Sequence, residues 1–326
     1  MEFPLLGEML ALGAAVGWAT AIVLFKTVGD RLGPIALNTF KNLLAFVLIP
    51  PTMLLFGQDV LVDAPMADYG LLILSGVLGM GVSDTLYLMA LNRLGAAVWA
   101  IANTLYAPMV VVMAMIFLGE TLSVLQWAGV VLVLVALLLV GGERRRNGKK
   151  TADEPVKVRS GLFPKPKPSV SPAHAQFSRR DWLLGLTFAV LGMLSMAISV
   201  IIIKPVLDRS PVYWATEMRL AGGLLFLLVL IVANKRPGAL FKPWKDPFVI
   251  KRMFPAAFVG TYLALVLLQG GLKYTQASTA TVLTQTSTLF IFILAVVFLK
   301  EPVNLRRIFG VVLGLGGAVL VIFGGV

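Results

Sequence analysis

Ten apolar stretches of 18 to 23 residues run through this chain, and they determine the solvent in which it can fold. An α-helix rises about 1.5 Å per residue, so about 20 residues cross a hydrocarbon core about 30 Å thick. A mean hydropathy of +0.90 leaves too little polar surface for the alternative, a large soluble protein with buried helices. We therefore predict an all-α integral membrane protein with ten transmembrane helices. The stretches cover residues 5–25, 34–56, 70–90, 96–118, 124–141, 182–204, 211–233, 254–272, 277–299 and 307–325.

The near absence of cysteine and histidine excludes several kinds of chemistry. The chain has no cysteine, and its one histidine, His174, lies in a polar segment between two stretches. Disulfides, thiolate metal sites and a histidine relay at membrane depth are therefore excluded, and we expect no metal and no cofactor. The sequence has no nucleotide-binding motif. We expect a protein that is not an enzyme and that draws on an ion or solute gradient.

The net charge of +12 is distributed unevenly between the two sides of the predicted bundle. Loops after the first, third, fifth, seventh and ninth stretches hold 23 of the 28 lysines and arginines, whereas the other loops hold three. An excess of Lys and Arg in short loops marks the cytoplasmic side. We predict a prokaryotic inner-membrane protein whose basic loops meet anionic lipid headgroups in the cytoplasm, with both termini on the opposite side. No nucleic-acid partner is expected, although a basic tail for nucleic acid stays an alternative for 142–180.

Residues 142–180 divide the ten stretches into two sets of five. This segment is rich in Lys, Arg, Pro and Ser, so we expect a flexible linker. A shift of 181 residues places FLGE at 117–120 on FLKE at 298–301, and a shift of 178 places Lys41 on Arg219. We therefore predict two five-helix repeats, at 1–141 and 181–326. Because five is odd, equivalent helices cross in opposite directions, and such inverted repeats place a site between them near mid-membrane.

The duplicated five-helix pattern, with a glutamate after the fourth and the ninth stretch (Glu120 and Glu301), resembles the EamA-type branch of the drug/metabolite transporter superfamily. The links Asn-Arg-Leu-Gly-Ala-Ala at 92–97 and Lys-Tyr-Thr-Gln-Ala-Ser at 273–278 are also similar to those of the family. The resemblance implies a carrier of small metabolites, amino acids or drugs, often directed outward. It also implies cytoplasmic termini, the opposite of what the charge count predicts.

The ninth stretch carries uncharged polar side chains at i, i+3, i+4 and i+7, which places on one helix face Thr281, Thr284, Gln285 and Thr288. The shift of 181 places Asn103 and Thr104 of the fourth stretch on the two central members of this face. We predict that these groups face one another across a central substrate cavity. The alternative is that they join neighbouring helices by hydrogen bonds.

Aromatic side chains inside the stretches are candidates for the apolar walls of such a cavity, namely Trp18, Trp99, Tyr106 and Tyr262. Trp and Tyr also mark membrane interfaces, which is the simpler interpretation of any one of them. Pro108 in the fourth stretch is expected to kink its helix and to widen the cavity.

Charged residues within membrane spans are costly, so they are usually functional or paired. We assign a coupling or gating role to the charged residues at or inside the spans: Glu8, Lys41, Asp84, Glu217 and Arg219. Asp84 or Glu217 would exchange a proton or release its partner during transport. Arg219 is expected to pair with Glu8 or with a substrate group. The alternative is that the side chains of Lys41 and Arg219 extend toward lipid headgroups.

Glu120 and Glu301 each stand just before a predicted helix. A carboxylate there satisfies free N–H groups at the positive end of the helix dipole, so helix capping is our interpretation, with gating as the alternative.

These features together predict a secondary transporter that moves a small polar metabolite, such as an amino acid, by alternating access, most simply outward. Alternatives are a channel, a flippase for lipid-linked sugars, or a carrier of organic phosphates or drugs with the same fold. The GxxxG patterns at 13–17 and 310–314 suit packing within one chain or a homodimer, so both a monomer and a homodimer stay open.

Overall fold

A computed structural model describes residues 5–25, 34–87, 89–90, 93–94, 103–142, 179–233, 247–299 and 305–325, and within these ranges the chain is helical without strands. The elements before the linker are α1 (Leu6–Phe25), α2 (Pro34–Leu55), α3 (Met66–Gly76), the π-helical η1 (Val77–Ser83), α5 (Tyr106–Phe117) and α6 (Val124–Gly142). Those after it are α8 (Arg179–Arg209), α9 (Val212–Ala233), α11 (Pro247–Ala257), the π-helical η3 (Phe258–Leu263), α12 (Ala264–Tyr274), α13 (Ala277–Gln285), α14 (Ser287–Leu299) and α15 (Leu305–Phe323).

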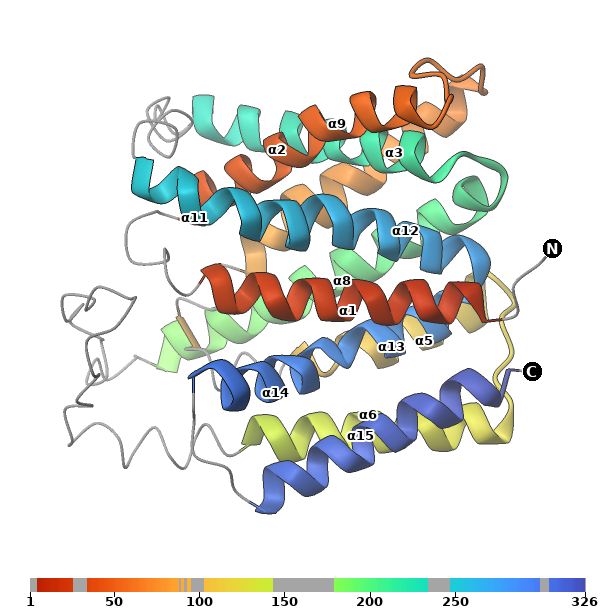
Figure 1. The fold of residues 1–326 in the computed structure, drawn as a ribbon, viewed down its shortest axis with the longest axis vertical. Coiled ribbons are helices and arrows are strands. Elements are labelled where there is room, and N and C mark those ends of the chain that lie inside the picture. The colour runs from red at the N-terminus through yellow and green to blue at the C-terminus, as the bar shows by residue number, and fades with distance from the viewer. Residues whose placement is uncertain are drawn as a thin grey trace.

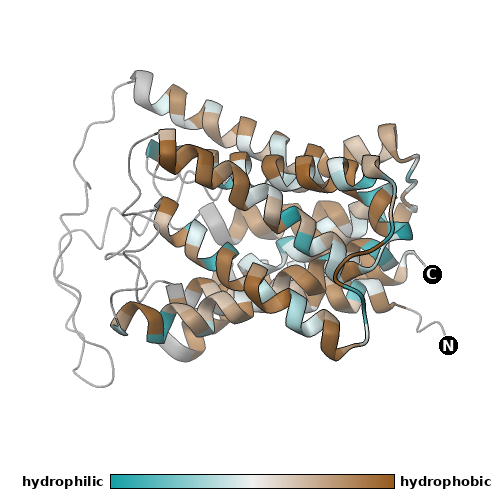
Figure 2. Ribbon diagram, turned by 90° about the horizontal axis from the view of Figure 1, so that it is seen from above, coloured by the Kyte–Doolittle hydropathy of each residue, from teal (hydrophilic) through white to brown (hydrophobic). Residues whose placement is uncertain are grey.

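Each of the ten predicted stretches coincides with one or more of these helices. Among the described residues, six helical segments are long and apolar enough to cross a membrane, and four shorter ones, in α1, α5, α6 and α15, are also apolar. The helices lie side by side in one bundle, with α6 and α15 paired along one edge (Figure 1). Figure 2 shows hydrophobic residues along most of each helix, and among the residues it colours, hydrophilic ones lie at the end of the bundle near the termini and at scattered positions along the helices. The predicted all-α membrane fold is confirmed.

Equivalent helices of the two halves run in opposite directions, as the odd number of spans predicts. Glu8 at the start of α1 binds Thr275, and Thr275 lines a pocket together with Lys204 and Asp208 near the end of α8. The start of α1 and the end of α8 therefore lie at the same end of the bundle. We call this end, where α1 begins and α15 ends, the terminal face (Figure 1).

The two repeats are interleaved rather than set side by side. The third unit of the first half, α3 with η1, packs on α8 and α9 of the second half. The third unit of the second half, α11 with η3 and α12, packs on α1 and α2 of the first half. Shifts of 178 and 181 residues relate these contacts, because they take Ala21 to Ser199 and Gly79 to Gly260. A Cβ at Gly79 would meet Ser199, and a Cβ at Gly260 would meet Ala21.

Glycine allows the backbones of the two halves to come together. A Cβ at Gly76 of α3 would lie 1.9 Å from the carbonyl oxygen of Arg219 in α9, and a Cβ at Gly222 of α9 would lie 2.2 Å from the carbonyl oxygen of Ile73. Two serines join α3 to α8 next to this contact, since Ser75 Oγ lies within hydrogen-bond distance of Ser199 Oγ, at 2.9 Å. Small residues at such crossings let membrane helices approach closely.

Two membrane spans are interrupted at positions that the repeat relates. One break lies at Thr104–Leu105 just before α5, and the other at Thr286 between α13 and α14; the shift of 181 takes Leu105 to Thr286. Pro108 accounts for the first break, because a proline ring clashes with the carbonyl four residues earlier, that of Thr104. At the second break, Thr286 Oγ1 donates to the carbonyl of Leu283. A side-chain hydroxyl of this kind competes with the helical main-chain pattern.

The glycine contacts predict that Gly76→Ala destabilises the fold, because the new methyl group would overlap the main chain of α9. We expect a loss of about 3 kcal/mol, the upper end of the range typical of overpacking with backbone displacement. Thermal unfolding in detergent, followed by size-exclusion chromatography, measures it. Gly70→Ala in the same helix is the matched control, because a Cβ there meets nothing within 4 Å. Equal thermostability of the two variants would contradict the close contact.

Candidate functional site

A cavity of about 290 Å³ lies between the two repeats and is lined by side chains from both. Trp18 of α1, Lys41 of α2 and Tyr106 of α5 come from the first half. Arg219 of α9 and Gln285 of α13 come from the second. This volume is at the lower end of the range for small-molecule sites, about 300–1,000 Å³. The cavity has the position that inverted repeats predict for a substrate site.

The interrupted helices bring amide and hydroxyl groups to the cavity. Asn103, Thr284 and Gln285 line it, together with Ser287 at the start of α14. Gln285 Nε2 donates to the main-chain carbonyl of Asn103 at 3.1 Å, across the boundary between the repeats. In an unbroken helix this carbonyl would accept from the N–H four residues later. The helix break thus supplies an acceptor that the other repeat satisfies.

Four of the predicted substrate residues lie outside the cavity lining: Thr104, Thr281, Thr288 and Tyr262. The break at Thr286 changes the course of the helix, so the predicted face does not continue from Thr284 to Thr288. Thr281 interacts with the Tyr106 side chain, and Tyr262 OH lies 2.6 Å from Thr52 Oγ1 of α2. Trp99 lies outside the described residues.

Lys41 and Asp84 form an ion pair in the cavity wall. Lys41 Nζ donates to Asp84 Oδ2 at 3.1 Å, and both side chains are about one quarter exposed. The pair joins α2 to the segment that continues from η1. Each charge is therefore compensated, and the pair adds no net charge to the cavity.

Arg219 reaches the same cavity from α9 but has no acidic partner among the described residues. Its side chain is buried, and Nη2 donates to Ser199 Oγ at 2.9 Å. Nε and Nη1 have no hydrogen-bond partner in the part of the chain that the structure describes. Glu217, two residues earlier, is buried outside the cavity lining, and its Oε2 is likewise without a described partner.

The predicted pairing of Arg219 with Glu8 is wrong. Glu8 lies in the first turn of α1 on the terminal face, where its Oε1 accepts a 2.6 Å hydrogen bond from Thr275 Oγ1. Arg219 lies seven residues into α9, at the depth of the central cavity. Estimates of depth from span boundaries placed the two residues too close together.

Glu120 caps a helix, but not the one that follows it. Its carboxylate accepts hydrogen bonds from the main-chain N–H groups of Ala277 and Ser278, at 2.6 and 2.9 Å, and from Ser278 Oγ. These groups begin α13 in the other repeat. The following helix, α6, is capped by Ser123 and Gln126, which bond to each other's main-chain N–H. The repeat-equivalent Glu301 lies outside the described residues.

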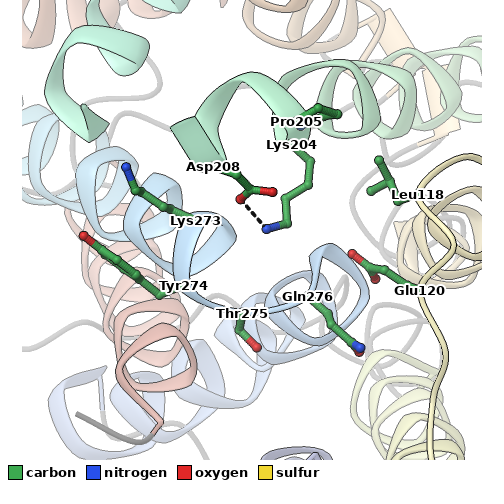
Figure 3. Close-up of a pocket in the computed structure, with 9 residues that line it drawn as sticks. All are labelled: Leu118, Glu120, Lys204, Pro205, Asp208, Lys273, Tyr274, Thr275 and Gln276. Carbon is green, nitrogen blue, oxygen red and sulfur yellow. Dashed lines mark hydrogen bonds and ion pairs between the residues drawn. The ribbon is translucent and has the colours of Figure 1, made fainter. Parts of the chain in front are cut away.

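A polar vestibule of about 520 Å³ opens on the terminal face beside Glu120 (Figure 3). It is formed by the ends of α5, α8 and α12 and by the start of α13. Lys204 Nζ donates to Asp208 Oδ1 at 2.6 Å within it. Buried apolar side chains lie on these helices between vestibule and central cavity, among them Val110, Ile203, Leu272 and Ala280. The vestibule and the central cavity have no lining residue in common.

Sequence reasoning missed the polar face of α2. Asn38, Lys41 and Asn42 stand at i, i+3 and i+4, and Asn42 lines the cavity beside Lys41. Asn38 Nδ2 donates to the carbonyl of Met80 in η1 at 3.2 Å. The helical spacing that identified the polar face of the ninth stretch would have identified this one. Nothing in the spacing indicated that η1 would leave a carbonyl for Asn38.

Comparison with known proteins identifies the protein family. The sequence profile of the EamA-like transporter family matches residues 5–142 and 183–323. The chain belongs to the EamA-like transporter family, and the resemblance to the drug/metabolite transporters is confirmed. A protein of Archaeoglobus fulgidus described as an uncharacterized transporter is 24% identical over 93% of each chain.

Two further similarities are more limited. The threonine/homoserine exporter RhtA of Salmonella typhimurium is 31% identical over 134 residues, which are 41% of this chain and 43% of RhtA. A crystal structure at 16% identity matches 98% of this chain and 96% of its own with a TM-score of 0.73, which supports the fold alone.

The cavity geometry predicts that Gln285→Leu weakens transport, because it removes an amide from the cavity lining and the donor to the half-buried Asn103 carbonyl. We expect the Km of a transported solute to rise about tenfold, the scale of one lost buried hydrogen bond. Uptake kinetics in proteoliposomes measure it. Thr288→Val is the control, because Thr288 lies on α14 outside the lining. An equal change in both variants would indicate a general packing role.

Proposed function

We propose that this transporter is a secondary carrier that moves a small polar metabolite by alternating access through the central cavity. The observation that carries the proposal is a small cavity between inverted repeats, lined by polar groups of both halves. Inverted repeats allow such a site to open to either side in turn. The predicted substrate residues that line the cavity are Trp18, Asn103, Tyr106, Thr284 and Gln285.

An amino acid or a similarly small solute is the substrate we favour. The cavity volume of about 290 Å³ favours a small solute over a large one such as a lipid-linked sugar. One relative that matches part of the chain, RhtA of Salmonella typhimurium, is a threonine/homoserine exporter, and we extend that substrate class to this chain as part of the proposal. Export is the corresponding direction.

We propose that the side on which α1 ends is cytoplasmic, because the loops after the odd-numbered stretches carry most of the lysines and arginines of the sequence. Both termini would then lie outside. Labelling of single cysteines introduced at Ser123 and in the linker distinguishes this orientation from the reverse, and the natural chain has no cysteine to interfere.

We propose that Glu120 acts as a latch, a contact that holds the terminal face closed. It joins the α5–α6 connection of the first half to the start of α13 in the second half. A carboxylate at a helix N-terminus is stabilised by the helix dipole and by charge-assisted hydrogen bonds. Release of this contact would let the helices around the vestibule separate and open the cavity to the terminal face.

Counterflow in proteoliposomes tests the carrier proposal. Vesicles loaded with an unlabelled amino acid, beginning with L-threonine and L-homoserine, should accumulate the labelled form transiently and with saturation. Panels of sugars, organic phosphates and cationic drugs extend the search. A linear, non-saturating flux without trans-stimulation would indicate a channel and would contradict the proposal.

The latch predicts that Glu120→Ala opens the terminal face more often. In a protein whose only cysteine is Ser287→Cys, in the cavity lining, we expect an impermeant thiol reagent added on the terminal face to react about tenfold faster. The factor corresponds to a loss of about 1.4 kcal/mol from the closed state, less than the full value of the three hydrogen bonds. Ser123→Ala is the control, because the Ser123 hydroxyl caps α6 and donates to the Gly324 carbonyl, and among the described residues it has no hydrogen bond to α13. An unchanged labelling rate in Glu120→Ala would contradict the latch.

A further inference from the structure

Arg219 is a buried cation that the described part of the chain leaves without a counter-ion. The residue is 2% exposed, and of the five N–H groups of a guanidinium the structure shows one hydrogen bond, to Ser199 Oγ at 2.9 Å. Nε and Nη1 have no partner among the described residues. Buried charges in proteins are almost always paired, so a free guanidinium in a cavity wall requires an explanation.

The surrounding structure holds this guanidinium in place. The carbonyl of Arg219 lies against Gly76, so the main chain cannot shift toward α3. A Cβ at Gly79 would lie 2.5 Å from Ser199 Oγ and 3.2 Å from Arg219 Nη2, so glycine makes room for both groups. Ser199 itself is fixed by its hydrogen bonds with Ser75. The side chain is therefore preorganised at the edge of the cavity rather than free to extend to the lipid headgroups.

The internal repeat shows that the second half lacks the acidic partner present in the first. Lys41 is the equivalent of Arg219 under the shift of 178, and it is neutralised by Asp84 at 3.1 Å. The shift of 181 takes Asp84 to Leu265, which also lines the cavity. The first half therefore has its own counter-ion, whereas the second half has leucine in that position. Glu217 does not replace it, because residues two apart on a helix point in different directions and Glu217 lies outside the lining.

We propose that Arg219 binds an anionic carboxylate group of the transported solute. The inference rests on the proposed carrier function and makes the substrate an acid or a zwitterion. One unpaired cation balances one carboxylate, whereas a phosphate dianion would bring an excess charge into the cavity, because Lys41 is already paired with Asp84. A guanidinium also matches the planar geometry of a carboxylate. Gln285 Nε2 donates one N–H to the Asn103 carbonyl, so its second N–H and the second lone pair of that carbonyl remain for the rest of the solute.

Matched pairs of solutes test the proposal. In counterflow, the acids L-threonine, L-glutamate and succinate are compared with L-threoninamide, L-glutamine α-amide and succinamide, and glycerol 3-phosphate with glycerol. We expect wild-type protein to transport at least one acid at least tenfold better than its amide. Arg219→Gln should lower kcat/Km for that acid at least a hundredfold, and Arg219→Lys should restore part of it. Equal transport of acid and amide, a preference for glycerol 3-phosphate, or an unchanged Km in Arg219→Gln would overturn the proposal.

Thermal stability of the solute-free protein provides a second measurement that does not depend on transport. Replacement of an unpaired buried cation by neutral glutamine should raise the Tm, whereas Lys41→Gln should lower it, because Asp84 then loses its partner. A lower Tm for Arg219→Gln would mean that the protein already supplies a counter-ion, and it would overturn the proposal. If no solute counterflows in wild type, the carrier function fails, and the Tm comparison still decides whether Arg219 is unpaired.

Discussion

Contact between the main chains of the two halves is the constraint on which the other features depend. Lipid tails are as apolar as leucine, so burial of apolar side chains gives little drive for helix association in a membrane. Here α3 meets α9 at Gly76 and Gly222, where a side chain would overlap the opposite carbonyl. This contact fixes the carbonyl of Arg219 and thereby the depth of its guanidinium. The third unit of each repeat inserts between helices of the other, so neither half can form this arrangement alone.

The interruptions in helical geometry follow the same two-fold relation. Within the described part of the chain, the shift of 181 relates the π-helical segment η1 to η3 and the helix break at Leu105 to the one at Thr286. In a bilayer an unpaired main-chain group is costly, so irregular backbone occurs only where protein or a polar cavity satisfies it. Gln285 and Asn38 provide that satisfaction by bonding to carbonyls of Asn103 and Met80. The irregular segments and the polar side chains therefore form one system.

Sequence predicted the helical fold, because hydropathy patterns follow from the thickness of the bilayer, and it predicted the two halves from the internal repeat. Five of the ten residues predicted to bind substrate line the central cavity. Sequence reasoning paired Arg219 incorrectly with Glu8, because residues at span ends cannot be placed to within one helical turn from hydropathy. It extended a polar face to Thr288, because periodicity assumes an unbroken helix and the break at Thr286 has no proline to mark it. The partner of Glu120 was missed for a different reason: the contact joins residues about 157 positions apart, and no local pattern reports it.

The broken helices have a consequence for how such a site can diversify. Carbonyl groups at a break belong to the main chain, and no substitution at Asn103 removes its acceptor. Side chains such as Gln285 decide whether that acceptor is satisfied by the protein or left for a solute. The substrate preference of a duplicated transporter can thus change through a few side-chain substitutions, while the main-chain carbonyl groups at the helix breaks stay the same. The two halves differ at one such position, because Asp84 pairs with Lys41 in the first half and Leu265 stands at the equivalent position in the second, and a difference of this kind is enough to give a twofold-related scaffold an asymmetric preference.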